Sequence, residues 1–152
     1  MGYRYAWKYL FMQKFVGINR KVRWPVSFRT EISKWENISF HVDDMQIFWH
    51  FGCYFQNFSA HISVGEGSYI APNVGIITAN HNIVDLSKHE DGREVIIGNK
   101  CWIGMNSVIL PGVVLGEGTV VGAGSVVTKS FPEGHCTIAG SPARVIKFNN
   151  KE

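Results

Sequence analysis

The stretch that decides the fold is IGNKCWIGMNSVILPGVVLGEGTVVGAGSVV, residues 97–127. An aliphatic residue recurs in it every six positions, and a glycine usually follows that residue. Glycine or asparagine usually stands three places after the aliphatic residue, and the fifth place of each hexad is small or β-branched. Neither a helical period nor a strand period produces such spacing. The aliphatic positions are Ile97, Ile103, Ile109, Leu115, Val121 and Val127.

A fixed period of six is typical of a solenoid. The aliphatic side chains would point inward and stack on those of the coils above and below. The glycine or asparagine would turn each corner, where the backbone needs a positive φ that these residues adopt at low cost. Three such faces make one triangular coil. We therefore predict an all-β fold, a left-handed parallel β-helix built from hexapeptide repeats.

The repeat extends upstream of this stretch but becomes irregular toward the N-terminus. Phe58, Val64, Ile70 and Ile76 are again six apart. Residues 42–57 keep the hexad poorly and are rich in aromatics, so we expect early coils whose large side chains fill or cap one end. We divide the chain into a basic aromatic N-terminal segment (1–36, a helix plus linker) and a β-helix domain (37–152) with a closing C-terminal strand, in which Lys151 and Glu152 are expected to be frayed.

Positive charge is concentrated in residues 1–35, which hold eight Lys or Arg and one Glu, while the whole chain has a formal net charge of +3. Residues 3–16 lack Gly and Pro and predict a short helix. This helix could pack its aromatics onto the solenoid end with its lysines solvated. Alternatively, residues 1–35 could contact an anionic membrane or a lipid-linked substrate peripherally. No nucleic-acid-binding motif accompanies the charge, so no nucleic-acid partner is expected.

A polar stretch interrupts the repeat between Ile76 and Ile97 and predicts a loop excursion at about residues 82–94. His81 stands where the repeat breaks, and Asn80 occupies a place where other hexads keep a small or β-branched residue. Departure from a local rule beside a long polar loop indicates a functional site. The candidate catalytic residues are therefore His81 and Asn80, and the candidate substrate-binding residues are Asp85, His89 and Glu90.

The chain shows no metal-ligand spacing within a strand or helix, so no metal is expected in a single chain. Its three cysteines are odd in number and widely spaced. Together with the lack of a signal peptide, they predict a reducing cytoplasm. No apolar run is long enough to span a bilayer.

The segment IAPNVGIITANHN, the polar loop, and the run from CWIG through GAGSVVTK to AGSPARVIK together resemble the hexapeptide-repeat O-acetyltransferases. The likeness covers roughly residues 58–148 and is strongest to maltose and galactoside acetyltransferases and to the acetyltransferases of surface-polysaccharide clusters. It implies a homotrimer with active sites between neighbouring β-helices, acetyl-CoA as cosubstrate and a saccharide acceptor.

The resemblance also implies roles for individual residues. His81 matches the family's catalytic histidine and would take a proton from a sugar hydroxyl, which then attacks the thioester carbonyl. An unperturbed imidazole titrates near pH ~6.5, so a neutral base is available at pH 7. The coenzyme A contacts would fall on Trp102, Met105, Ala123, Gly124, Thr128, Lys129, Arg144 and Lys147.

The function predicted from the sequence is therefore acetyl-CoA-dependent O-acetylation of a saccharide, in surface-polysaccharide biosynthesis. An acetyltransferase with a non-sugar acceptor (serine, an amino sugar or an antibiotic) stays open, because the fold supports many acyl acceptors. A zinc lyase resembling the γ-carbonic anhydrases, with three histidines meeting across subunits, is the first rival class. A non-catalytic scaffold is the second.

Overall fold

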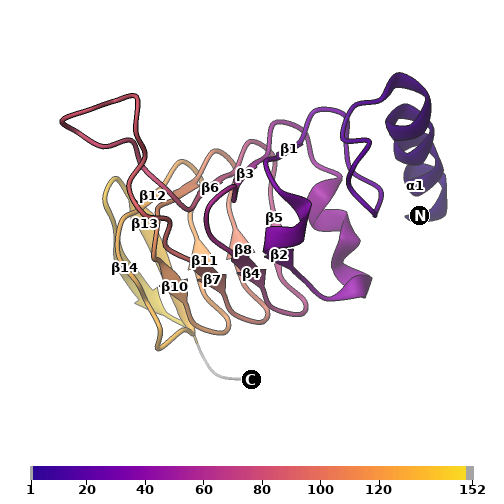
Figure 1. The fold of residues 1–152 in the computed structure, drawn as a ribbon. Coiled ribbons are helices and arrows are strands. Elements are labelled where there is room, and N and C mark those ends of the chain that lie inside the picture. Colours follow the sequence, from indigo (N-terminus) through magenta and orange to yellow (C-terminus); the bar gives the residue numbers. More distant parts are fainter. Residues whose placement is uncertain (1, 150–152) are drawn as a thin grey trace.

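The computed structural model describes residues 2–149, and its strands form three long sheets that are parallel except at one edge (Figure 1). Sheet A has the order β1-β3-β6-β9-β12, sheet B the order β2-β4-β7-β10, and sheet C the order β5-β8-β11-β13-β14. From β3 to β12, successive strands along the chain belong to successive sheets A, B and C. This is the left-handed parallel β-helix that the hexad period predicts.

The strands are short, as one face of a hexad-built coil requires. They are β1 (Glu31–Ile32), β2 (Ile38–Ser39), β3 (Tyr54–Gln56), β4 (Ile62–Val64), β5 (Tyr69–Ile70), β6 (Gly75–Ile77), β7 (Val95–Ile97), β8 (Trp102–Ile103), β9 (Val108–Ile109), β10 (Val114–Leu115), β11 (Val120–Val121), β12 (Val126–Val127), β13 (Cys136–Gly140) and β14 (Ala143–Phe148).

The interior and the corners follow the roles predicted for each place of the hexad. All six aliphatic positions of residues 97–127 are buried, and so are the five small or β-branched fifth-place residues. The predicted corners have positive φ, for example 61° at Asn106 and 66° at Gly118. Lys100 also turns a corner, with φ 52°, although its residue type gave no indication of this.

The N-terminal end of the solenoid is closed by aromatic packing. In the first coil the 3-10 segment η3 (Val42–Phe48) follows β2 in place of a strand of sheet C. Phe48 and Phe55 are fully buried, with ring centroids 5.2 Å apart. The expectation that Phe58 continues the inward repeat is wrong, because its side chain is exposed while Ile62 fills the interior instead.

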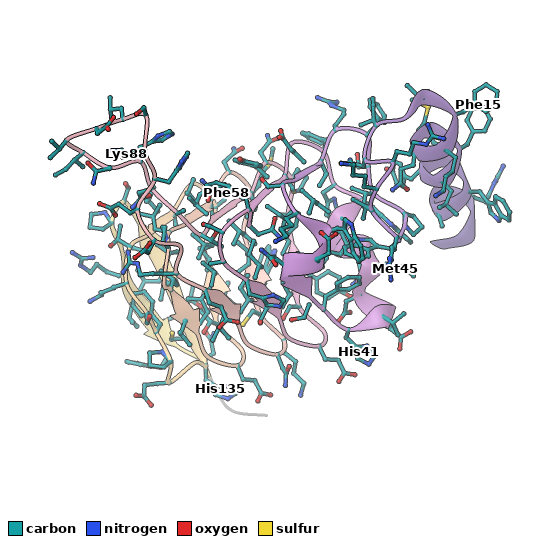
Figure 2. All side chains as sticks on the ribbon, viewed as in Figure 1. Phe15, His41, Met45, Phe58, Lys88 and His135 are labelled. Carbon is teal, nitrogen blue, oxygen red and sulfur yellow. The ribbon has the colours of Figure 1, made fainter. Side chains whose placement is uncertain are left out.

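The predicted N-terminal helix is present as α1 (Gly2–Phe11), which continues as the π-helical η1 (Met12–Val16). A hydrogen bond ties it to the capped end: the Tyr9 hydroxyl donates to the Trp49 carbonyl (3.1 Å). The expectation that its aromatics pack onto the solenoid is wrong for Trp7, Phe11 and Phe15, which are 73%, 60% and 82% exposed. Figure 2 shows Phe15 projecting away from the rest of the molecule.

Gln13 anchors the turn that follows the helix. Its side chain is buried, donates to the carbonyls of Asn19 and Trp24 (both 3.1 Å) and accepts from the Val26 amide (3.2 Å). No helix among residues 2–149 is long and apolar enough to cross a membrane.

The opposite end of the solenoid closes with the predicted final strand. β14 pairs antiparallel with β13 at the edge of sheet C. The predicted fraying of Lys151 and Glu152 lies outside the described residues. At the other end, parallel pairing already begins at β1, whose Glu31 pairs with Tyr54. Residues 31–36 of the N-terminal segment thus contribute to the first coil.

Candidate active site

The loop predicted at about residues 82–94 projects from the solenoid at the corner between β6 and β7 (Figure 1). Its base is closed by hydrogen bonds from the Arg93 amide to the Thr78 carbonyl (2.8 Å) and from the Glu90 amide to the Asn80 carbonyl (2.9 Å). His81 and His89 face each other as an antiparallel bridge between the two arms. The chain leaves the wall at Asn80, which is exposed where other hexads bury a small residue.

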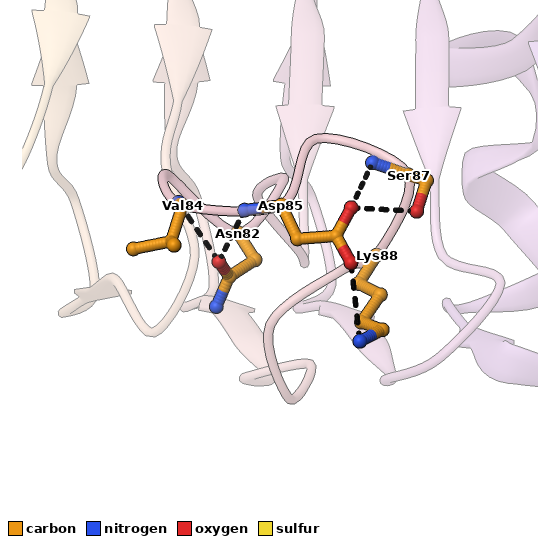
Figure 3. Close-up of polar contacts among 5 residues, drawn as sticks. All are labelled: Asn82, Val84, Asp85, Ser87 and Lys88. Carbon is orange, nitrogen blue, oxygen red and sulfur yellow. Dashed lines mark hydrogen bonds and ion pairs between the residues drawn. The ribbon is translucent and has the colours of Figure 1, made fainter.

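The tip of the loop is held by its own polar side chains (Figure 3). The Asn82 side-chain oxygen accepts from the amides of Val84 and Asp85 (both 2.9 Å). The Asp85 carboxylate accepts from the Ser87 amide (3.1 Å) and hydroxyl (2.6 Å), and pairs with Lys88 at 3.1 Å. The Ser87 hydroxyl, then Lys88, lower the pKa of Asp85 from its ordinary value. In a single chain Asp85 therefore shapes the loop.

The loop fixes the tautomer of His81. Its Nδ1 lies 2.9 Å from the Leu86 carbonyl oxygen. A carbonyl oxygen only accepts, so this hydrogen bond requires the proton on Nδ1. In the neutral ring Nε2 then carries the lone pair. The ring is exposed, so Nε2 can reach a proton on a bound molecule.

An aromatic stack supports the histidine from the base of the loop. The ring centroids of His81 and His89 are 4.3 Å apart, and the rings of His89 and Phe58 form a T-shaped pair with centroids 4.9 Å apart. Phe58 belongs to the corner of the preceding coil, so the stack joins the loop to the wall. Neither this role of Phe58 nor the contact to Leu86 is predicted from the sequence. A large aromatic at a repeat position where the following coils keep an aliphatic residue, one coil before a polar loop, is the pattern that could have indicated the first.

The residues predicted to contact coenzyme A lie on two different edges of the prism. Met105, Ala123 and Gly124 occupy the corners between sheets C and A, where the Gly124 amide donates to the Met105 carbonyl (2.8 Å). Trp102 lies on sheet C beside Tyr69 and is 56% exposed. Arg144 and Lys147 are exposed on β14 of the same sheet.

The second edge, between sheets A and B, carries the other predicted residues. Thr128 and Lys129 follow β12 on this edge, two coils beyond the loop that bears His81, Asp85, His89 and Glu90. Sheet A separates the two edges. One chain therefore does not bring all the predicted residues together.

Metal-ligating side chains do not cluster in the described part of the chain. Among residues 2–149, no group of three or more His, Cys, Asp or Glu side chains is placed to hold a metal ion. The three cysteines are free and buried, and burial raises the pKa of their thiols.

Residues 94–129 match the family of bacterial transferase hexapeptide repeats (six repeats). The match covers the central repeats of the solenoid. A relative from Escherichia coli K12, whose name assigns it to lipopolysaccharide biosynthesis as an O-acetyl transferase, is 38% identical over 103 residues, 60% of this chain and 52% of its own. This chain spans about half the length of the curated relatives it matches.

Solved structures of hexapeptide-repeat proteins show the same fold. A maltose O-acetyltransferase from Clostridium difficile 630 superposes with a TM-score of 0.60 and 41% identity, covering 65% of this chain and 54% of that one. A galactoside acetyltransferase in complex with coenzyme A gives a TM-score of 0.61 at 35% identity, covering 66% of this chain and 50% of that one.

Proposed function

We propose that this chain is an acetyl-CoA-dependent O-acetyltransferase that acts on a saccharide hydroxyl in surface-polysaccharide biosynthesis. The observation that supports it best is the placement of His81. Its exposed imidazole lies at the base of a loop on a hexapeptide-repeat solenoid, and its Nδ1 donates a hydrogen bond to the Leu86 carbonyl. The named roles of the relatives, an O-acetyl transferase of lipopolysaccharide biosynthesis among them, favour a saccharide as acceptor.

In the proposed reaction His81 is the general base. Its Nε2 takes the proton of the acceptor hydroxyl while that oxygen bonds to the acetyl carbonyl carbon. The carbon–sulfur bond then breaks, and the proton passes to the leaving thiolate, so an ester and a free thiol are formed. The Leu86 carbonyl stabilises the imidazolium that exists between these two transfers, because it accepts the Nδ1 proton throughout.

Cosubstrate binding would use the residues on both edges. The exposed side chains of Trp102 and Met105 offer apolar contact to the acyl arm. Lys129, Arg144 and Lys147 are exposed cations that suit phosphate groups, and none of them belongs to an ion pair among residues 2–149. Asn80, His89 and Glu90 lie at the loop base, where they would border the acceptor.

Because these residues lie on two edges of one prism, we propose that a neighbouring copy completes each site in a homotrimer. Exposed apolar side chains support this association. At the loop tip, Ile83, Val84 and Leu86 are 87%, 90% and 71% exposed. A projecting apolar tip of this kind is typical of a surface that becomes buried against another chain. The loop of one copy would then place His81 beside the coenzyme A residues of the next.

We further propose that the N-terminal segment, residues 1–36, docks through α1 and η1, and that residues 37–152 form the catalytic solenoid together with β1. The face of α1 and η1 that carries Trp7, Phe11 and Phe15 also carries Lys8 and Lys14, and all five are exposed. Exposed aromatics interleaved with cations suit the headgroup region of an anionic bilayer. The enzyme would accordingly work in the cytoplasm, at the inner face of the membrane.

The proposal is tested by mixing the purified protein with acetyl-CoA and a panel of sugars, and measuring free thiol. The assay has a low background, because the protein's own thiols are buried. Acceptor-dependent thiol release, with CoA binding seen by calorimetry and a trimeric mass in light scattering, supports the proposal. Absence of CoA binding together with one zinc per chain would instead favour the zinc-lyase class.

A further inference from the structure

A cavity of about 610 Å³ lies at the N-terminal end of the solenoid, away from the predicted coenzyme A residues. Its walls come from the turn after η1 and from the corner between β1 and β2. Three cations line it, Arg20, Lys21 and Lys34, against one carboxylate, Glu36. Three of the eight Lys or Arg in residues 1–35 thus line this cavity.

These cations form no ion pair with a carboxylate among residues 2–149. The ion pairs among residues 2–149 are His41–Asp43, Asp85–Lys88 and Lys100–Glu117, and none involves the cavity. A fourth cation, Arg23, lies over the ring of Trp35 at 4.3 Å, beside the same wall. Unneutralised cations around a cavity favour a ligand with more than one negative charge.

The cavity lies on the same edge of the prism as His81. Residues 33–37, 57–61 and 78–94 are the successive corners between sheets A and B. The first two corners are joined through Asn57, whose side chain accepts from the Lys34 amide (2.9 Å) and donates to the Lys34 carbonyl (2.7 Å).

Gln56 makes the next link along this edge. Its side chain accepts from the amides of Thr78 and Ala79 (both 3.0 Å) and donates to the Ala79 carbonyl (2.9 Å). Since neighbouring strands lie about 4.8 Å apart, two coils separate the cavity from the loop base by roughly 10 Å. One sugar ring and a diphosphate can bridge such a distance.

We propose that the cavity binds the diphosphate of a diphosphate-linked saccharide, whose sugar extends along this edge to His81. This inference rests on the proposed function, because it names the acceptor class of that site. Arg20, Lys21 and Lys34 hold the phosphate oxygens, and the sugar hydroxyl reaches Nε2 of His81. Nucleotide-linked and lipid-linked sugars share this chemistry.

The test measures binding of inorganic pyrophosphate by calorimetry with coenzyme A present in excess, so that the cosubstrate's own diphosphate site is filled. The wild type is expected to bind pyrophosphate, and Arg20→Gln/Lys34→Gln to bind it about a hundredfold more weakly, about tenfold for each cation removed. Both side chains are exposed, so the variant should fold. The control is Arg29→Gln, an exposed basic residue outside the cavity.

Steady-state acetylation provides the second readout. For a uridine diphosphate hexose, the double variant should raise KM by more than tenfold and leave kcat nearly unchanged. Farnesyl diphosphate as competitor distinguishes the sources: stronger competition than by uridine diphosphate assigns a lipid-linked acceptor, and weaker competition a nucleotide-linked one. Equal pyrophosphate binding by wild type and variant overturns the inference. That result leaves the proposed function standing if coenzyme A still binds and a neutral sugar is still acetylated.

Discussion

The glycine that usually follows an inward aliphatic residue allows the coils to stack, and a pair of alanine substitutions tests this. An added Cβ at Gly104 would lie 2.6 Å from both the Val121 carbonyl oxygen and the Ala123 amide nitrogen of the next coil. The corner glycine Gly124 has φ 71° and no other atom within 4 Å of such a Cβ. The two glycines are thus required for different reasons.

The magnitudes of the two effects should differ. At Gly124 an alanine would be destabilising only because a residue with a Cβ must adopt the left-handed backbone conformation, which costs about 1–2 kcal/mol. At Gly104 the coils must move apart, which costs about 1–3 kcal/mol for overpacking. It also weakens the 2.8 Å hydrogen bond from the Gly104 amide to the Val121 carbonyl, a further loss of about 1 kcal/mol. We expect Gly104→Ala to lower the free energy of unfolding by about 3 kcal/mol.

Urea denaturation followed by circular dichroism, at one fixed protein concentration, measures both variants. The account predicts that Gly104→Ala destabilises the protein about twice as much as Gly124→Ala. Equal midpoints for the two variants would refute the reasoning, because they would mean that the wall tolerates a methyl group where the coils touch.

Three other predictions concern the loop and the N-terminal segment. The folded loop lowers the pKa of Asp85, so the loop should keep its conformation above about pH 4 and lose it as the pH falls and the carboxylate becomes protonated. Amide hydrogen exchange at Ser87 and Lys88 should accelerate over that range. The variant Asp85→Asn should show no such dependence on pH. Gln13→Ala should destabilise the N-terminal end by about 2–3 kcal/mol in thermal melts, since it leaves the buried Val26 amide without a partner; an unchanged melting temperature would contradict this. Trp7→Ser/Phe11→Ser should weaken co-sedimentation with phosphatidylglycerol vesicles more than tenfold, whereas equal binding of the wild type to phosphatidylcholine vesicles would argue against charge-assisted docking.

The repeat was predictable because each place of the hexad has one physical task. Ile103, Ile109 and Val121 must fill the interior, and Asn106 and Gly118 must turn corners, so residue types reveal the fold directly. The prediction fails where another residue performs the task. Lys100 turns a corner at φ 52° without being glycine or asparagine.

The candidate site was predictable only in part. The break in the repeat located His81 and the loop, because a polar stretch cannot continue a buried wall. The tautomer of His81 depends on where the Leu86 carbonyl lies, and that position follows from the Asp85 and Asn82 contacts at the tip. Such contacts depend on the three-dimensional geometry of the loop, and no repeating pattern in the sequence predicts them. The exposure of Trp7 and Phe11 could not be predicted from the sequence either, because the same aromatic side chains could also pack against the solenoid.

Whether His81 is the base for acetyl transfer is tested by comparing the initial rates of the wild type and His81→Asn at saturating acetyl-CoA and a fixed saccharide acceptor concentration. The exposed His41 serves as control, as His41→Asn. The account predicts that His81→Asn lowers kcat by about 10²–10⁴-fold while coenzyme A binds with unchanged affinity, and that the control keeps its rate. A His81→Asn variant that transfers acetyl groups at the wild-type rate would contradict it.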